Sequence, residues 1–206
     1  MLHVFIPLKK SGRFPGKNAR LAAFTRAWLA QELLYIPVPS AVWTVGDASE
    51  RGDFPFLWQH IPASTGSQLG DLTAACQHVE SLSPQENRYV LLQLTQPLRK
   101  RGLLRQVLAA LEEQEPVITA SRRPSADWRR LAPTGSHAPH PQDDIALHLD
   151  GQVYAWRTPA GLQAIYDPAA EKAVVDSGQC WGVCDIDYEA DLPPALTSMA
   201  ADLLLN

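Results

Sequence analysis

Short apolar runs alternate with helix-like segments along most of this chain, and this alternation restricts its fold more than any other feature. The run YVLLQL at residues 89–94 is almost continuously apolar, which is typical of a central parallel strand covered by helices on both faces. The predicted strands are 2–8, 41–46, 55–61, 89–94, 116–121, 152–158, 173–177 and 182–187, and the predicted helices are 19–34, 70–82, 100–115, 161–165 and 192–205. Repeated strand–helix units predict an α/β protein, a three-layer α/β/α sandwich with a mostly parallel sheet.

The composition is that of an ordinary globular chain of 206 residues, a length that suits a single domain with a substantial core. A net charge of −4 argues against nucleic acid as the main partner. No apolar run approaches the roughly 20 residues of a membrane helix, and at the N-terminus the apolar run precedes the charges, the reverse of a signal peptide. We therefore expect a cytoplasmic protein that does not bind a membrane.

The three cysteines, Cys76, Cys180 and Cys184, are an odd number, and the spacing of the last two does not fit a redox C-x-x-C motif. They are expected to be reduced structural thiols, because free cysteines are usually buried. Residues 122–144 contain four prolines, one glycine and two serines. This segment is predicted to be an excursion from the sheet within the single domain, because strands resume after it.

A basic loop with two glycines follows the first predicted strand. It carries Lys9, Lys10, Arg13 and Lys17, with Gly12 and Gly16 between them. Glycines allow the backbone to turn sharply and approach a ligand, and cations beside exposed N–H groups suit a polyphosphate. The loop does not match the P-loop motif or the dinucleotide G-x-G-x-x-G motif. A solvated surface turn is the alternative interpretation. The position of the loop, directly after a buried strand, favours phosphate binding, since ligands of such sheets bind at the carboxyl ends of strands.

Five segments, taken in order, resemble the motifs of the acylneuraminate cytidylyltransferase family, the synthetases of CMP-activated acidic sugars. The first keeps Ile6-Pro7 and Pro15-Gly16-Lys17-Asn18, and the second, VWTVGD at 42–47, lies where the family has V-V-S-T-D. The third is LLQLTQPLR at 91–99, the fourth is PQDDIALHLDGQVYAWR at 141–157, and the fifth is Asp185-Ile186-Asp187. The resemblance spans the chain and implies a nucleotide-diphospho-sugar transferase-like fold, in a divergent member of the family.

The resemblance implies that the anomeric hydroxyl of an acidic 2-keto-3-deoxy sugar attacks the α-phosphorus of CTP and releases pyrophosphate. It implies catalytic roles for Lys17, Arg13, Asp185 and Asp187. The implied nucleotide-binding residues are Leu8, Lys9, Ser11, Gly12, Arg13, Lys17, Asp71 and Thr95, and the implied sugar-binding residues are Gln93, Gln142, Asp143, Tyr154 and Arg157. The excursion, extended to about residues 122–150, resembles in position the arm through which family members dimerise, so we expect a homodimer.

Asp185 and Asp187 are expected to bind Mg²⁺, because side chains two apart share one face of a strand and carboxylates are hard oxygen ligands. The alternative interpretation is a polar strand end before a helix. Asp71 is predicted to be an N-cap of its helix. Arg99 and Arg157 are both candidates to bind the sugar carboxylate. Asp150 stands where the family has Asn, and a carboxylate there is expected to repel an acidic sugar unless a cation intervenes.

Two other functions remain open. The first is another nucleotidyltransferase, or a glycosyltransferase in which Asp185-Ile186-Asp187 is the D-x-D motif that holds a nucleotide-sugar through a metal. The second is a degenerate member that binds a nucleotide without catalysis. The family's arginine before Pro62 is missing here, which favours the non-enzyme. Lys17, Gln93 and the two late aspartates oppose it.

Overall fold

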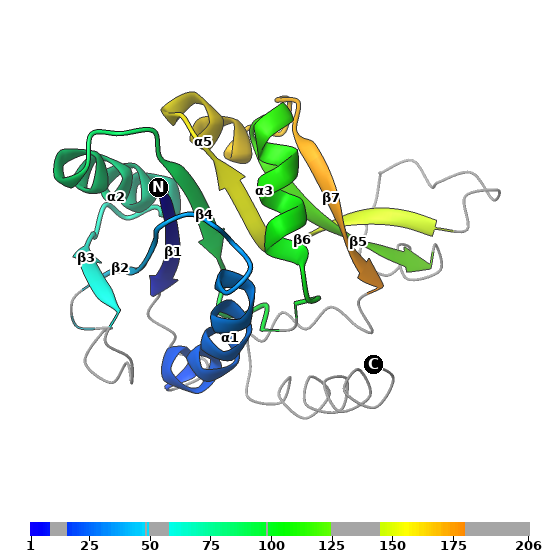
Figure 1. Cartoon of the computed structure of the whole chain (residues 1–206), viewed down its shortest axis with the longest axis horizontal. Coiled ribbons are helices and arrows are strands. Elements are labelled where there is room, and N and C mark those ends of the chain that lie inside the picture. The colour runs from blue at the N-terminus through cyan, green and yellow to red at the C-terminus, as the bar shows by residue number, and fades with distance from the viewer. Residues whose placement is uncertain (9–15, 48, 50–57, 98, 125–144, 180–206) are drawn as a thin grey trace.

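Seven strands in the described part of the chain form one sheet between two layers of helices (Figure 1). The computed structural model of the protein describes residues 1–8, 16–47, 49, 58–97, 99–124 and 145–179. The strands are β1 (Leu2–Leu8), β2 (Ser40–Gly46), β3 (Gln59–Pro62), β4 (Arg88–Leu92), β5 (Val117–Pro124), β6 (Ile145–Trp156) and β7 (Ala173–Gln179). The helices are α1 (Lys17–Leu33), α2 (Gln68–Leu82), α3 (Leu103–Glu113) and α5 (Pro159–Tyr166).

The strands lie in the order β3-β2-β1-β4-β6-β5-β7. β6 runs antiparallel to its neighbours β4 and β5, and the other described pairs are parallel. In β1, Val4 and Ile6 pack towards α1 and α3, whereas Phe5 packs towards α2 and α5. This alternation follows from the two-residue period of a strand, and it gives the sheet a separate apolar core on each face. The predicted α/β/α sandwich with a mostly parallel sheet is confirmed.

The predicted elements agree with the structure in kind and differ at their ends. The predicted strand at 55–61 is the shorter β3, and residues 50–57 lie outside the described residues. β6 begins earlier than predicted because its first half pairs with β5. The predicted elements at 182–187 and 192–205, and residues 125–144 of the excursion, also lie outside the described residues.

The prediction that Asp71 caps α2 is wrong. The N-cap is Ser67, whose hydroxyl accepts a hydrogen bond from the amide of Gly70 at 3.0 Å. Asp71 lies in the first turn and instead accepts hydrogen bonds from the amide and the hydroxyl of Thr65, both at 2.8 Å. A carboxylate in the first turn also interacts favourably with the positive end of the helix dipole. Asp71 therefore does stabilise the start of α2, but from inside the first turn and not as the N-cap.

Cys76 is buried on α2, and burial raises the pKa of its thiol to about 12. A thiol with this pKa is almost entirely protonated at neutral pH and is a poor nucleophile. The expected structural role is therefore confirmed for Cys76. Cys180 and Cys184 lie outside the described residues.

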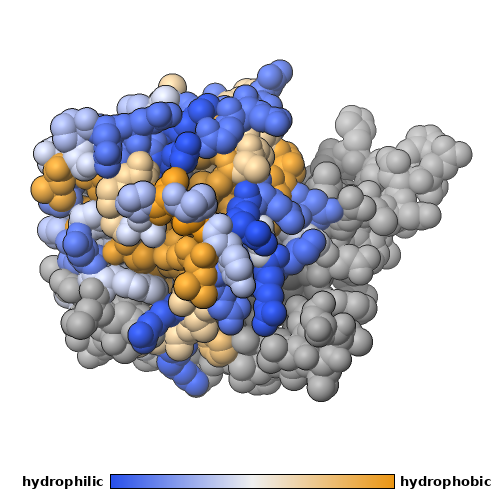
Figure 2. Space-filling view, viewed as in Figure 1, coloured by the Kyte–Doolittle hydropathy of each residue, from blue (hydrophilic) through white to orange (hydrophobic). Residues whose placement is uncertain are grey.

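The surface mixes hydrophobic and hydrophilic residues on the face shown in Figure 2. Several exposed apolar side chains are found at element ends, including Leu34 and Tyr35 after α1 and Leu82 at the end of α2. The guanidinium of Arg105 lies over the Tyr35 ring, 5.3 Å from its centroid, and covers part of it. Among the helices that the structure describes, none has the length and apolar character needed to cross a membrane.

His3 is buried in β1 between two hydrogen-bond partners. Its Nδ1 accepts a hydrogen bond from the indole of Trp43 at 3.1 Å, and its Nε2 lies 3.1 Å from the side-chain oxygen of Asn87. An imidazole that accepts at one nitrogen and donates at the other is neutral. Burial lowers the pKa of His3, and the hydrogen bond with Asn87 offsets only part of this decrease.

We expect the free energy of unfolding to decrease as the pH falls below about 6.5, the ordinary histidine pKa, since the unfolded chain then takes up a proton that folded His3 resists. The stabilisation is present above pH 6.5 and is lost as the pH falls toward the lowered folded-state pKa. Urea unfolding at pH 7 and pH 5.5 measures the effect, and His3→Gln should reduce the difference between the two. A His3 ring signal that titrates by NMR at its ordinary pKa in the folded protein would contradict this expectation.

Candidate active site

Parallel strands β1 and β4 are neighbours, so the residues that follow their carboxyl ends lie at one edge of the sheet. Leu8 ends β1, and Gln93 comes directly after β4. Lys17 begins α1 after the basic loop, whose residues 9–15 lie outside the described residues. The structure therefore brings the end of β1 and the predicted sugar-binding Gln93 to the same edge.

The start of α1 has the local structure that the glycine in PGKN predicts. Gly16 adopts a left-handed conformation, with φ 69°, and no side chain caps the helix. Glycine suits this conformation because it has no Cβ to clash with the backbone. The first turn of α1 has no acidic residue, so the positive end of the helix dipole is not offset by a carboxylate there. The ammonium group of Lys17 and the N-terminus of α1, where Lys17 lies, therefore both favour an anion.

Gln93 and Tyr154 meet at Gly151, which lies in β6 at the same edge. A Cβ at Gly151 would be 3.1 Å from the Tyr154 hydroxyl oxygen and 3.7 Å from Nε2 of Gln93. Gly151 also has φ 67°, so both its conformation and its crowded surroundings favour glycine. The structure thus brings two of the predicted sugar-binding side chains to the same glycine, and their contact with a sugar stays a prediction.

Thr95, in the loop after β4, and Asp71, in the first turn of α2 after β3, are also near this edge. Thr95 follows Gln93 in a turn in which the amide of Gln96 donates to the carbonyl of Gln93 at 3.2 Å. Asp71 holds the loop before α2 through Thr65, as described above. Their predicted contacts with a nucleotide remain predictions.

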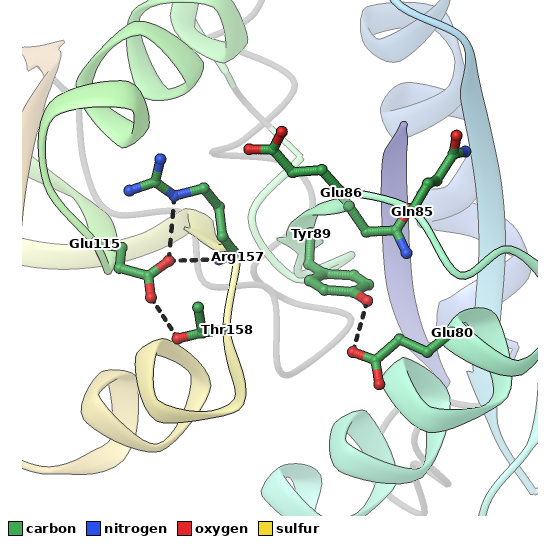
Figure 3. A pocket seen from close by; sticks show the side chains of 8 residues that line it. Glu80, Gln85, Glu86, Tyr89, Glu115, Arg157 and Thr158 are labelled. Carbon is green, nitrogen blue, oxygen red and sulfur yellow. Dashed lines mark hydrogen bonds and ion pairs between the residues drawn. The ribbon is translucent and has the colours of Figure 1, made fainter.

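Arg157 lies at the opposite edge of the sheet. It follows Trp156, which pairs with Tyr89 at the start of β4. Its backbone amide donates to Oε2 of Glu115 at 2.8 Å, and its Nε lies 3.4 Å from the same oxygen. The hydroxyl of Thr158 donates to the other carboxylate oxygen (Figure 3).

This opposite edge has a pocket of about 430 Å³. It is lined by Glu80, Gln85, Glu86, Asn87, Tyr89, Glu115, Arg157 and Thr158.

Tyr154 and Arg157 are three residues apart in an extended segment, about 10 Å along the strand. The structure therefore does not bring Arg157 together with Gln93, and the Arg157 side chain is already paired with a carboxylate.

Asp150 is buried, with 5% of its surface exposed, in a network that joins β5, β6 and β7. Its Oδ1 accepts from the hydroxyl of Thr119 at 2.6 Å and from the amide of Gln152 at 3.0 Å. Its Oδ2 accepts from the side-chain amide of Gln152 at 3.2 Å and from the hydroxyl of Ser177. The expected repulsion of an acidic sugar was conditional on no cation intervening, and the structure places one, because the charge of Arg99 interacts with that of Asp150.

Arg99 joins three elements next to this network. Its Nε donates to the carbonyl of Gln152 at 3.2 Å, one terminal nitrogen donates to the hydroxyl of Thr25 at 3.1 Å, and the other donates to the carbonyl of Gln93 at 2.5 Å. The guanidinium also lies over the Trp28 ring, 5.3 Å from its centroid. Burial lowers the pKa of Arg99 to about 9, and the charge of Asp150 opposes this shift, so Arg99 is protonated at neutral pH.

α1 holds the chain after Arg99 through two further contacts. The indole of Trp28 donates to the carbonyl of Lys100 at 3.1 Å. The carboxylate of Glu32 accepts from the amide of Gly102 at 2.6 Å and from the amide of Leu104 at 3.0 Å. α3 has glycine as its N-cap, so the missing side-chain cap is supplied by Glu32 from another helix. Sequence analysis missed this role. The available signal was the position of Glu32, three and four residues after the apolar Leu29 and Trp28, which places a carboxylate on the apolar face of the predicted helix.

The remaining predicted site residues lie outside the described residues. They are Lys9, Ser11, Gly12, Arg13, Gln142, Asp143, Asp185 and Asp187. Within the residues that the structure describes, no group of three or more His, Cys, Asp or Glu side chains could hold a metal ion.

No protein-family model and no curated protein matches the chain. Solved structures do resemble it along almost its whole length. A CMP:2-keto-3-deoxy-manno-octonic acid synthetase complexed with CTP matches with a TM-score of 0.68 and 14% identity, over 98% of this chain and 99% of that one. A 4-diphosphocytidyl-2C-methyl-D-erythritol synthase from Anaerococcus prevotii matches with a TM-score of 0.62 and 13% identity, over 97% of this chain and 98% of that one.

A third similar structure, Rv0371c from Mycobacterium tuberculosis, has a TM-score of 0.61 and 13% identity over 95% of this chain and 97% of that one. At these identities the likeness concerns the fold. The chain therefore shares the fold of these solved structures, as the sequence resemblance implied.

Proposed function

We propose that this protein is a nucleotidyltransferase that transfers the cytidylyl group of CTP to an acidic 2-keto-3-deoxy sugar. The anomeric hydroxyl of the sugar would form a bond to the α-phosphorus, and the bond from that phosphorus to pyrophosphate would break. The observation that carries the proposal is the end-to-end likeness to a synthetase whose structure holds CTP. The placement of Lys17 and of the Gln93–Tyr154 pair near the carboxyl edge supports it, because ligands of such sheets bind there.

Lys17, with Lys9 and Arg13, would neutralise the phosphates of CTP. Charge on the transferring group and on the leaving group is the main barrier in such reactions, and cations lower it by electrostatic stabilisation. Contacts with the rest of the nucleotide are proposed for Leu8, Ser11, Gly12, Asp71 and Thr95.

Gln93 and Tyr154 would bind the sugar hydroxyls, as their amide and phenol groups can donate and accept hydrogen bonds. Gln142 and Asp143, which precede β6 in the sequence, are proposed to bind the same sugar. The position of Arg157, at the other edge and paired with Glu115, leaves it out of the proposed sugar site.

Mg²⁺ is the cofactor proposed for this reaction, held by Asp185 and Asp187. Two carboxylates two positions apart in a predicted strand are a donor set that suits a hard divalent cation. When bound, the ion would offset negative charge on the phosphates. A cytoplasmic location, which rests on the N-terminal charge pattern, and a homodimer formed through residues 122–150, which rests on the sequence resemblance, complete the proposal.

Pyrophosphate release tests the proposed function directly. Purified protein is incubated with Mg²⁺ and each of CTP, UTP, ATP and GTP, with or without an acidic 2-keto-3-deoxy sugar. Release should require CTP and the acidic sugar together, since a site whose hydrogen-bonding groups match one base leaves them unpaired with another. Equal release with UTP and a neutral hexose phosphate would favour another nucleotidyltransferase, and binding of CTP without release would favour the non-enzyme.

Lys17→Ala should weaken binding of CTP more than binding of CMP, because the ammonium group is proposed to face the β- and γ-phosphates. Loss of one charge-assisted contact costs about 1.5–3 kcal/mol, or roughly 10- to 100-fold in affinity. Calorimetry with both nucleotides measures the difference. Arg26→Ala, which removes a cation from an exposed position farther along α1, is the matched control and should change neither affinity. Equal losses for CTP and CMP would show that Lys17 does not contact the terminal phosphates.

A further inference from the structure

Each nitrogen of the Arg99 guanidinium donates a hydrogen bond to the protein. The acceptors are the carbonyls of Gln93 and Gln152 and the hydroxyl of Thr25. One face of the guanidinium lies against the indole of Trp28. A guanidinium presents its donors in a rigid plane, so these contacts fix its orientation. An arginine held in this way has little freedom to turn towards a substrate carboxylate.

The groups that Arg99 holds are those next to the proposed sugar site. The carbonyl of Gln93 belongs to the residue whose side-chain amide lies 3.7 Å from a Cβ position at Gly151. The carbonyl of Gln152 belongs to the residue that follows Gly151. One guanidinium therefore holds the backbone of Gln93 and of the residue after Gly151, where the Gln93 side chain approaches β6. Asp150, whose charge acts favourably on Arg99, holds Gln152 through both its amide and its side chain.

We propose that Arg99 is a positioning residue, which orients Gln93 towards the sugar and does not itself bind the sugar carboxylate. This inference rests on the proposed function. Thr25 extends the same arrangement to α1, the helix that begins with Lys17. Thr25 is eight residues after Lys17, more than two turns along α1, so the guanidinium acts on the sugar side of the proposed site.

Arg99→Lys tests the inference, because lysine keeps the charge but cannot donate in three fixed directions. We expect kcat/KM for the sugar to fall by about 10- to 100-fold, the size of effect that a small misplacement of a binding group produces. The KM for CTP should change little. Arg105→Lys is the matched control, since it makes the same change in an arginine that lies over Tyr35 on the surface, and it should leave both constants unchanged.

A double-mutant cycle shows whether Arg99 acts through Gln93. If it does, Gln93→Ala combined with Arg99→Lys should be no slower than Gln93→Ala alone. Losses that multiply would overturn the proposal. A sugar analogue with a carboxamide in place of the carboxylate provides another arm, for which Arg99→Lys should cost the same factor as with the acid. A much smaller loss with the carboxamide would assign Arg99 to the carboxylate and also overturn the proposal.

A measurement that needs no turnover separates this inference from the proposed function. The side-chain amide signals of Gln93, assigned by their disappearance in Gln93→Glu, should shift in Arg99→Lys and stay in place in Arg105→Lys. Thr25→Val removes one acceptor while nearly preserving shape, and it should shift the same signals if Arg99→Lys fails to fold. Unchanged Gln93 signals in a folded variant would overturn the positioning role, whereas a wild-type protein without transferase activity would overturn only the proposed function.

Discussion

Replacing Asp185 or Asp187 by Asn should abolish Mg²⁺-dependent turnover, with a loss of about 100-fold or more. The reason is that each carboxylate is proposed to hold the ion, which contributes several kcal/mol of transition-state stabilisation in reactions of this class. An amide keeps the shape of the side chain but lacks the negative charge that a divalent cation needs. Pyrophosphate release at limiting Mg²⁺ measures the effect.

The midpoint of urea unfolding should change little in either variant, because the proposed role is catalytic. Asp167→Asn is a suitable control, since Asp167 is exposed and its carboxylate accepts a hydrogen bond from the amide of Ala169 at 2.9 Å, a contact that an asparagine oxygen can keep. If both Asp185→Asn and Asp187→Asn turn over at nearly the wild-type rate at low Mg²⁺, these aspartates do not hold the ion.

Asp150→Asn should destabilise the fold by about 2–4 kcal/mol, since it removes a buried charge and leaves polar neighbours unpaired. All four described contacts of the carboxylate are with donors. An asparagine can accept on one side only, so its NH₂ group would face either Thr119 and the Gln152 amide or Ser177 and the Gln152 side chain. It would also remove the negative charge that favours protonated Arg99.

Urea unfolding at neutral pH measures this loss, and Asp167→Asn again supplies the same chemical change at an exposed position. The control should change the free energy of unfolding by less than about 0.5 kcal/mol. A loss of comparable size in the two variants would show that the network around Asp150 is not needed for stability. This prediction is independent of any catalytic activity.

The two largest expected effects concern opposite kinds of aspartate. Asp150 has its oxygens occupied by protein donors, so it stabilises the sheet where β5, β6 and β7 meet. Asp185 and Asp187 are proposed to keep oxygens available for an ion. Residue type alone does not separate these roles, since the availability of the oxygens depends on which donors the fold places around them.

The sequence by itself determined the α/β class, the order of the elements and the mostly parallel sheet. β4 could be predicted because a strand buried on both faces must be apolar at successive positions, as Val90, Leu91 and Leu92 are. The start of α1 could be predicted closely because Gly16 supplies a local backbone conformation that depends little on distant residues. The nomination of Gln93 and Tyr154 came from motif resemblance, and in the structure both side chains lie within 4 Å of a Cβ position at Gly151.

Only the tertiary structure decided the roles of Asp150, Arg99 and Arg157. Asp150 and Arg157 belong to one motif in the sequence, yet β6 carries them to opposite edges of the sheet, because an extended chain advances about 3.3 Å per residue. Arg99 obtains its partners from residues 25, 93 and 152, which are distant in sequence and meet only when α1, β4 and β6 pack together. Local patterns report backbone preference and burial, whereas the partner of a buried charge is set by long-range packing, which no short motif contains.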